Sequence, residues 1–416
     1  YIMEYIEQLG VNAKAAEPLV SSMGTNEKNR ALAAISETLR THVTEIIGAN
    51  QLDIENARKN GMSEAMIDRL TLTEARIAGM ADGVDKVISL ADPIGAVIGG
   101  SDLPNGLHVI KKRVPIGTIG IIFESRPNVT VDAAALCFKA GNAVILRGGS
   151  DAINSNKALV GLMRTALESA GADRNAVQLV EDTSREVANA MMKLNKYIDL
   201  LIPRGGGGLI RAVINNATVP VIQTGEGNCH VYVDESADID MAVNIIDNAK
   251  TQRPSVCNAI ENILVHEKAA PALFRKLDER WQGKVAIRGD EETAKLVKVE
   301  KIADDTDYAT EFLDYRLSSK VVKDVDEAIA HINRFGTKHS ECIVTENIHN
   351  AEKFQQMIDA AAVYVNASTR FTDGFEFGLG AEIGISTQKL HARGPMGLEA
   401  LTTYKYLVNG NGQVRK

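Results

Sequence analysis

Cysteine is scarce in this sequence and is never closely paired. No two cysteines have the CxxC spacing of a zinc site or a redox centre. This spacing argues against a disulfide framework and against a bound metal. Unpaired thiols are typical of a reducing compartment, so we expect a cytoplasmic protein. The cysteines are Cys137, Cys229, Cys257 and Cys342.

Long apolar runs and strong charge of one sign are also lacking. No apolar run approaches the roughly 20 residues that a membrane span needs. The first residues show neither the basic region nor the apolar core of a secretory signal. The formal net charge is −8 and no basic run is present, which argues against a nucleic-acid partner. An anionic substrate would therefore need a local group of arginines.

The residues that are present have the composition of a globular protein, with 45% hydrophobic and 24% charged residues. A chain of 416 residues is too long for one ordinary core, so we expect two or three domains. β-like and helical runs alternate from residue 118 onward, and a second such set begins after His230. This alternation predicts α/β units with a doubly wound parallel sheet. The first set of predicted strands covers residues 118–123, 143–146, 177–180, 198–202 and 219–222.

The segments outside these sets have patterns of their own. Residues before Asp92 predict helices, one of them with an apolar stripe from Leu32 to Ile46 and Asn26 as its capping residue. Residues 93–106 are rich in glycine, proline, aspartate and asparagine, which predicts a loop. Residues 107–117 alternate and predict a protruding hairpin arm, with which the β-like C-terminal segment could pair. Exposed ribbons of this kind invite pairing between subunits, so we expect a homodimer or a larger homo-oligomer.

One stretch, residues 250–261 with the sequence KTQRPSVCNAIE, has the features of a catalytic loop. It places the Cys257 thiol between a helical run and a β-like run, with Arg253 before it and Asn258 after it. A nearby cation or unpaired backbone amides favour the thiolate, which is the nucleophilic form. The alternative is that Cys257 is a small buried hydrophobic residue, the usual fate of such a cysteine.

Two predicted strand ends carry glycine-rich turns suited to an anion. Arg204, Gly205 and Gly206 follow one strand and open a helix, where backbone amides can bind a phosphate. A plain left-handed turn is the alternative. Arg147, Gly148 and Gly149 follow another strand, and no acidic residue is there to bind a ribose 2′-hydroxyl. An arginine at this position suits a 2′-phosphate and favours NADP over NAD, the alternative being a solvent-exposed arginine without a ligand.

Further polar residues lie in predicted loops. Asn128 could donate its amide to an oxyanion, or it could simply cap the helix that follows. A substrate with carboxylate and phosphate groups would need several cationic side chains, and candidates recur beside proline, glycine or serine. His331 and His339 lack partners at ligand spacing and are interpreted as structural, so we predict no metal site. The candidate substrate-binding residues are Arg126, Arg253, Arg370 and His391.

Several motifs together resemble the gamma-glutamyl phosphate reductases, a branch of the aldehyde dehydrogenase superfamily. The likeness extends over nearly the whole chain, and the cysteine-containing and C-terminal motifs are the most specific to this branch. The motifs are SRPNVTVD, GNAVILRGG, DLLIPRGG, KTQRPSVCN, HINRFGTKHSE, VYVNASTRFTDG and QKLHARGPMGLEALTTYKY.

The resemblance implies the NADPH-dependent reduction of L-glutamyl 5-phosphate to L-glutamate 5-semialdehyde and phosphate, the second step of proline biosynthesis. It places Cys257 on the family's nucleophile, Asn128 on its oxyanion amide and Glu311 on the glutamate that binds the nicotinamide ribose. It also implies NADPH as cofactor and the upstream glutamate 5-kinase as a possible partner. The alternative within the superfamily is an oxidative aldehyde dehydrogenase that uses water as acyl acceptor.

The superfamily fold implies the domain boundaries. We expect an NADP-binding domain at 1–106 and 118–229, a catalytic domain at 230–366, and an oligomerisation arm at 107–117 and 385–416. Two positions depart from the pattern. The oxidative enzymes have a Glu-Leu-Gly-Gly motif, where this chain has TGEGNCH, which leaves the role of Glu226 open. Phe335 replaces an expected histidine or tyrosine, so we assign it no substrate role.

Overall fold

The computed structural model describes all 416 residues and divides into two compact units. Unit 1 comprises residues 1–223, 379–384 and 396–416, and unit 2 comprises residues 224–378 and 385–395. The expected boundary at 229 is therefore too late. The reason is physical: residues before 229 form hydrogen bonds within unit 2, where Gly227 N donates to Glu311 Oε1 at 2.8 Å and Asn228 N donates to Thr337 Oγ1 at 2.9 Å. No helix is long and apolar enough to cross a membrane.

Unit 1 is built on a four-stranded sheet in the order β5-β4-β3-β6, and every neighbouring pair is parallel. The predicted strands at 118–123, 143–146, 177–180 and 198–202 are confirmed, with small shifts at their ends. The predicted strand at 219–222 is wrong, because Val221 forms only an isolated bridge to Leu201. The strands are β3 (Thr118–Phe123), β4 (Ala143–Arg147), β5 (Val177–Leu179) and β6 (Leu200–Arg204).

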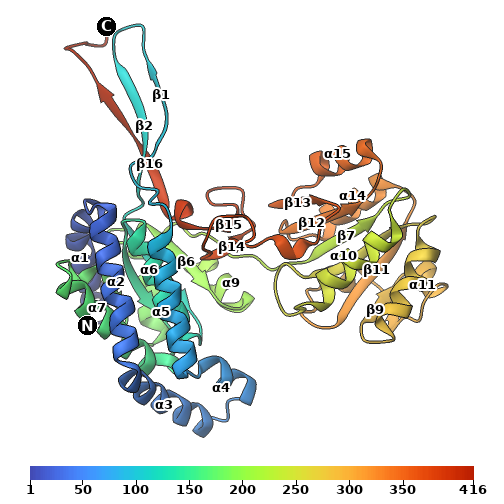
Figure 1. Cartoon of the computed structure of the whole chain (residues 1–416), viewed down its shortest axis with the longest axis horizontal. Coiled ribbons are helices and arrows are strands. Elements are labelled where there is room, and N and C mark those ends of the chain that lie inside the picture. The colour runs from blue at the N-terminus through green and yellow to red at the C-terminus, as the bar shows by residue number, and fades with distance from the viewer. The chain divides into compact units, whose positions relative to one another are not determined.

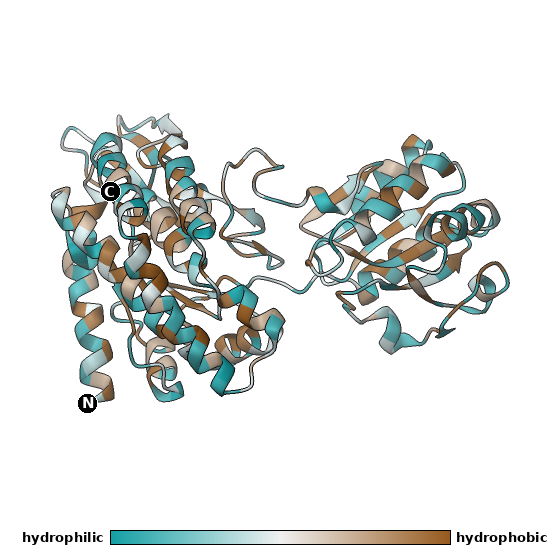
Figure 2. Ribbon diagram, turned by 60° about the horizontal axis from the view of Figure 1, so that its bottom comes forward, coloured by the Kyte–Doolittle hydropathy of each residue, from teal (hydrophilic) through white to brown (hydrophobic).

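Helices cover both faces of this sheet (Figure 1). On one face α1 and α8 bury an apolar cluster that includes Ile6, Ile145 and Met191. Figure 2 shows the mostly hydrophobic strands enclosed by helices that alternate between hydrophobic and hydrophilic stripes. The helices are α1 (Ile2–Ser21), α2 (Thr25–Thr41), α3 (Val43–Lys59), α4 (Glu64–Leu70), α5 (Glu74–Ser89), α6 (Pro127–Lys139), α7 (Ile153–Ser169), α8 (Arg185–Met192) and α9 (Gly207–Asn216), with 3₁₀ turns at Ser150–Ala152, Arg174–Ala176 and Leu398–Leu401.

The apolar stripe from Leu32 to Ile46 belongs to two helices, not one. α2 ends at Thr41, and His42 stands between it and α3 with a backbone that is not helical. The capping residue also differs from the expected Asn26. Gly24 is the N-cap of α2, and its amide donates to the Glu27 carboxylate at 3.0 Å.

The arm of unit 1 is an antiparallel three-stranded ribbon in the order β1-β2-β16 (Figure 1). The predicted loop at 93–106 is wrong in part, because residues in it form β1. Those residues are glycine-rich and exposed, so pairing with β2 rather than burial makes them a strand. The C-terminal segment does pair with β2, but residues 385–401 lie outside the arm. The strands are β1 (Val97–Asp102), β2 (His108–Pro115) and β16 (Thr402–Asn409).

Unit 2 contains a seven-stranded parallel sheet in the order β10-β9-β11-β8-β7-β12-β13. One face packs on α10 and α11, and the other on α14 and α15. Its strands are β7 (Cys229–Val233), β8 (Ile260–His266), β9 (Ala286–Gly289), β10 (Lys301–Ile302), β11 (Arg316–Val322), β12 (Ser340–Val344) and β13 (Ala362–Val365). Its helices are α10 (Ile239–Thr251), α11 (Ala270–Trp281), α12 (Glu291–Ala294), α13 (Asp305–Tyr308), α14 (Val325–Phe335) and α15 (Ile348–Met357), with a 3₁₀ turn at Thr369–Phe371; β14 (Gly384–Ser386) pairs with β15 (Gly394–Met396).

Candidate active site

Three strand ends meet at one edge of the unit 1 sheet. The central strand β3 lies between β4 and β6, so Glu124, Arg147 and Arg204 leave the sheet side by side. Ligands of parallel sheets bind at the carboxyl ends of the strands. The structure therefore brings together the glycine-rich turns that the sequence singled out.

Two buried donors at the end of β4 lack acceptors. Arg147 is half-buried rather than exposed, and its Nη2 donates to Thr183 O at 2.6 Å, but its Nε has no partner. Burial lowers the pKa of this guanidinium. Asn156 Nδ2 also has no partner, and a Cβ on Gly148 would come within 2.3 Å of it. Buried donors without acceptors are costly, so the edge is suited to an anionic group.

The turn between β6 and α9 already holds a carboxylate. Gly206 is the N-cap of α9, and its amide donates to Glu124 Oε2 at 3.0 Å. Arg204 Nη1 donates to Ile383 O at 2.6 Å. None of the glycines from Gly205 to Gly208 has a positive φ, so the alternative of a plain left-handed turn is wrong. A phosphate at this helix end would meet the Glu124 carboxylate.

Asn128 lies in the first turn of α6 and is exposed. The capping alternative is wrong, because Arg126 is the N-cap of this helix and Asn128 is inside it. The Asn128 amide makes no hydrogen bond within the chain, so both of its donors are available to a ligand. Arg126 is likewise exposed at the carboxyl end of β3.

In unit 2, Cys257 lies on the loop between α10 and β8, as predicted. It is partly exposed, whereas Cys137, Cys229 and Cys342 are buried. The alternative of a core cysteine is therefore wrong for Cys257. Burial raises the pKa of each of the other three thiols, which leaves them inert.

The backbone of Cys257 contacts Gly227 and Cys229, two residues to which the sequence alone assigned no role. A Cβ on Gly227 would lie 1.4 Å from Cys257 O, so only glycine fits there. Cys229 Sγ donates to the same carbonyl at 3.3 Å. Glu311 Oε1 in turn accepts from Gly227 N at 2.8 Å. Gly227, the second glycine in TGEGNCH, is the one signal that could have indicated this close approach.

One arginine, Arg370, forms hydrogen bonds with the loop that carries Cys257. Arg370 donates to Asn258 Oδ1, and its Nε donates to Gln252 Oε1 at 3.0 Å. Burial and the nearby Arg253 lower the pKa of Arg370, while Asp373 and Cys257 act in the opposite direction. Arg370 therefore lies within electrostatic reach of both Arg253 and Cys257.

The other predicted residues of unit 2 lie elsewhere. His391 is exposed in the loop between β14 and β15, next to Leu390. His331 is buried between His230, Tyr308 and Phe335, and burial lowers its pKa to about 2. His339 is buried beside Cys229, and burial lowers its pKa to about 4. No group of metal-ligating side chains has the geometry to hold an ion.

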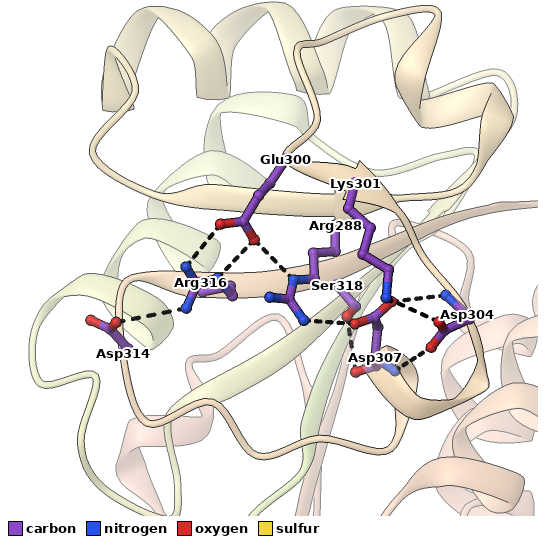
Figure 3. A network of polar contacts seen from close by, with 8 residues as sticks. All are labelled: Arg288, Glu300, Lys301, Asp304, Asp307, Asp314, Arg316 and Ser318. Atoms are coloured by element: carbon purple, nitrogen blue, oxygen red, sulfur yellow. Dashed lines mark hydrogen bonds and ion pairs between the residues drawn. The ribbon is translucent and has the colours of Figure 1, made fainter.

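The loop that carries Glu311 follows a charged network at the sheet edge (Figure 3). Arg288 of β9 binds Glu300 at 2.9 Å and Asp307 at 2.8 Å. Lys301 of β10 binds Asp304 and Asp307, each at 3.0 Å. Arg316 of β11 binds Glu300 at 2.8 Å. These contacts fix α13, and with it the start of the Glu311 loop.

The Asp307 carboxylate should make this edge sensitive to acid. Burial raises the pKa of Asp307, but the Asp304 amide, Lys301 and Arg288 outweigh it and bring the pKa to about 2. A lowered pKa gives stability that is present above the unfolded pKa of 3.8 and is lost as the pH falls toward 2. We expect Asp307→Asn to lower the free energy of unfolding by about 1–2 kcal/mol at pH 7. Urea denaturation should show the difference from the parent shrinking below pH 4, and a constant difference would contradict it.

Comparison with known proteins places these features in a family. The model of the aldehyde dehydrogenase family matches residues 4–296. A gamma-glutamyl phosphate reductase of Clostridium perfringens is 59% identical over 98% of both chains, and one of Carboxydothermus hydrogenoformans is 56% identical over 99% of this chain and 100% of its own. The crystal structure of gamma-glutamyl phosphate reductase from Thermotoga maritima is 51% identical, with a TM-score of 0.97 over 99% of this chain and 100% of its own.

More distant structures share the fold alone. An acetylating aldehyde dehydrogenase of Geobacillus thermoglucosidasius is 19% identical, with a TM-score of 0.69 over 100% of this chain and 98% of its own. The predicted aldehyde dehydrogenase-like α/β fold and the resemblance drawn from the motifs are both confirmed. The chain therefore belongs to the aldehyde dehydrogenase family, and within it to the gamma-glutamyl phosphate reductases.

Proposed function

We propose that this chain reduces L-glutamyl 5-phosphate to L-glutamate 5-semialdehyde and phosphate with NADPH, the second step of proline biosynthesis. The observation that carries the proposal is Cys257, a partly exposed thiol on a loop held by Gly227 and flanked by Arg253 and Arg370. A cationic surrounding favours a thiolate and an anionic substrate at the same place. The names of the relatives support the same reaction.

The chemistry follows from the residues. The Cys257 thiolate attacks the acyl carbon of the mixed anhydride, and the C–O bond to phosphate breaks, which leaves a thioester on Cys257 and releases phosphate. The Asn128 amide and the Cys257 N–H donate to the oxyanion that forms during the attack, which is worth roughly a hundred- to a thousandfold in rate. NADPH supplies, when bound, the hydride that reduces the thioester. Collapse of the resulting thiohemiacetal returns the Cys257 thiolate and yields the aldehyde.

The cofactor's phosphate groups would be held at the carboxyl edge of the unit 1 sheet. Arg147, whose buried Nε lacks an acceptor, would bind the 2′-phosphate, with Gly148 and Gly149 allowing close approach. Arg204, Gly205 and Gly206 would bind the pyrophosphate at the start of α9. Glu311 would accept a hydrogen bond from the nicotinamide ribose. Arg126, Arg253, Arg370 and His391 would bind the substrate's carboxylate and phosphate groups.

The proposed pyrophosphate site makes a prediction about Glu124. The Glu124 carboxylate accepts a hydrogen bond from the Gly206 amide and would repel a phosphate that binds there. We expect Glu124→Gln to tighten NADPH binding roughly three- to tenfold, since a screened repulsion of about 1 kcal/mol is removed. Titration of NADPH fluorescence gives the Kd, with Glu37→Gln on the exposed face of α2 as the charge-matched control. Unchanged or weaker binding would place the phosphates elsewhere.

The remaining assignments concern assembly and location. The β16 side of the arm exposes Tyr404, Tyr406 and Val408, which supports a role in forming a homodimer or a larger homo-oligomer. We also propose the upstream glutamate 5-kinase as a partner. Cysteines without disulfides support a cytoplasmic location.

One assay tests the reaction and separates it from the oxidative alternative. Purified protein is given the semialdehyde and NADP⁺, with or without inorganic phosphate, and absorbance of NADPH is followed. Phosphate is the acyl acceptor in the reverse of the proposed reaction, so we expect NADPH to form only when phosphate is present. Equal rates without phosphate would show that water is the acceptor and would refute the proposal. Repeating the assay with NAD⁺ tests the preference for NADP.

A further inference from the structure

A lysine and a glutamate are buried together beneath the Cys257 loop. Lys250 lies in the last turn of α10 and Glu261 lies in β8, and both are 0% exposed. Lys250 Nζ donates to Glu261 Oε2 at 3.1 Å and to Ile260 O at 3.0 Å. Burying two charges is costly, and it is tolerated only where partners satisfy both of them. The presence of this buried ion pair therefore suggests a role other than stabilising the fold.

Glu261 makes a second set of contacts, with the loop that carries Glu311. Its Oε2 accepts from Phe312 N at 3.0 Å, and its Oε1 accepts from Leu313 N at 3.3 Å. Leu313 has a φ of 55°, a left-handed conformation that a branched side chain disfavours. One carboxylate thus holds two consecutive amides of a strained turn.

The same loop is fixed at its start by the network of Figure 3. Ser318 Oγ donates to Asp307 O at 3.0 Å at that end. The middle of the loop, with Glu311, depends on Glu261. Glu311 accepts a hydrogen bond from Gly227 N, and Gly227 packs on the Cys257 backbone. A continuous series of contacts therefore leads from Lys250 to Cys257.

We propose that Lys250 and Glu261 are positioning residues, which hold the Glu311 loop and, through Gly227, the backbone of the nucleophile Cys257. The inference rests on the proposed function, in which Glu311 binds the cofactor and Cys257 forms the thioester. Neither side chain touches the reacting atoms. Their effect is geometric, and a displacement of about 1 Å at a reacting group can lower a rate roughly a hundredfold.

The charges of the pair depend on each other. Burial raises the pKa of Glu261 to about 7, and Lys250 together with the two loop amides opposes this rise. Burial lowers the pKa of Lys250, and Glu261 opposes this. Removing Lys250 alone would leave Glu261 without its cation, so the carboxyl would take up a proton and one acceptor for the loop amides would be lost.

The test compares Lys250→Met with the double variant Lys250→Met/Glu261→Gln, which removes both charges and keeps an acceptor for the loop. The control is Lys28→Met in unit 1, since Lys28 is also buried, at 1% exposure, and paired with Asp92 at 2.7 Å. For each variant we would measure the Tm, kcat and KM of the reductive reaction, and the rate at which iodoacetamide modifies Cys257.

We expect Lys250→Met to lower kcat roughly ten- to a hundredfold and to change the rate of Cys257 modification, and we expect the double variant to recover each of the two rates in part but not fully. Lys28→Met should lower the Tm by a similar amount while kcat stays within twofold. If Lys250→Met shows normal kcat and normal modification, the pair is only structural and the proposal is overturned. Should Lys250→Met fail to fold, the double variant carries the same test, and wild-type values of both rates in it would overturn the proposal. The iodoacetamide rate needs no substrate, so it reports on positioning even if the proposed reaction itself proves wrong.

Discussion

Replacing Cys257 with alanine is expected to abolish the reduction of glutamyl phosphate. No other thiol can take over, because Cys137, Cys229 and Cys342 are all buried. Without a nucleophile no thioester forms, and loss of a covalent nucleophile typically lowers kcat by roughly 10⁴-fold or more. NADPH oxidation measured by absorbance gives the rate. NADPH binding should remain, since the proposed phosphate contacts come from unit 1.

The matched control is Cys137→Ala, which removes a fully buried thiol from α6. Its loss should cost about 1 kcal/mol of stability through a small cavity and leave kcat nearly unchanged. A Cys257→Ala variant that retained more than a hundredth of the parent rate would remove the thioester from the mechanism. Loss of NADPH binding in that variant would instead indicate a folding defect.

Gly227→Ala should also lower the activity strongly, although Gly227 carries no side chain. The added Cβ would lie 1.4 Å from Cys257 O and 2.4 Å from its carbonyl carbon. These are backbone atoms, which cannot rotate away as the end of a side chain could. The Cys257 loop must therefore move, and we expect kcat to fall roughly a hundredfold and stability to fall by about 2 kcal/mol. Steady-state kinetics and thermal denaturation measure the two effects.

Gly79→Ala provides the control for this substitution. Gly79 lies in α5, and nothing is within 4 Å of its would-be Cβ. Alanine there should leave kcat unchanged and raise stability by about 0.5–1 kcal/mol, because alanine is the better helix former. If Gly227→Ala kept full activity, the Cys257 loop would be more adaptable than its packing indicates. The proposal that Glu311 positions Cys257 through Gly227 would then lose its support.

Hydrophobic periodicity was sufficient to predict the parallel sheets. Strands buried on both faces, such as β3, are continuous apolar runs, and helices covering them show an apolar stripe, so the class of each element is local information. The same reasoning failed at β1, whose exposed glycine-rich residues become a strand only because β2 lies beside them. It also missed the break at His42, since an apolar stripe can continue across two helices.

In the candidate site, too, local sequence predicted some features and tertiary contacts decided the others. The position of Cys257 between a helix and a strand could be predicted, because chain order alone places it there. The residues that hold it could not. Glu261 is the one acidic residue of the buried strand β8, which was a visible signal, but its partners Lys250 and Phe312 come from other elements.

By itself, the sequence determined most of the strands and helices, where the thiol and the glycine-rich turns fall between them, and the family. These depend on the order and polarity of neighbouring residues. Only the tertiary structure decided that Glu124 occupies the amide of Gly206, that Gly227 presses on Cys257, and that a buried ion pair holds the Glu311 loop. Those contacts join residues far apart in the chain, and their existence depends on distances that folding alone sets.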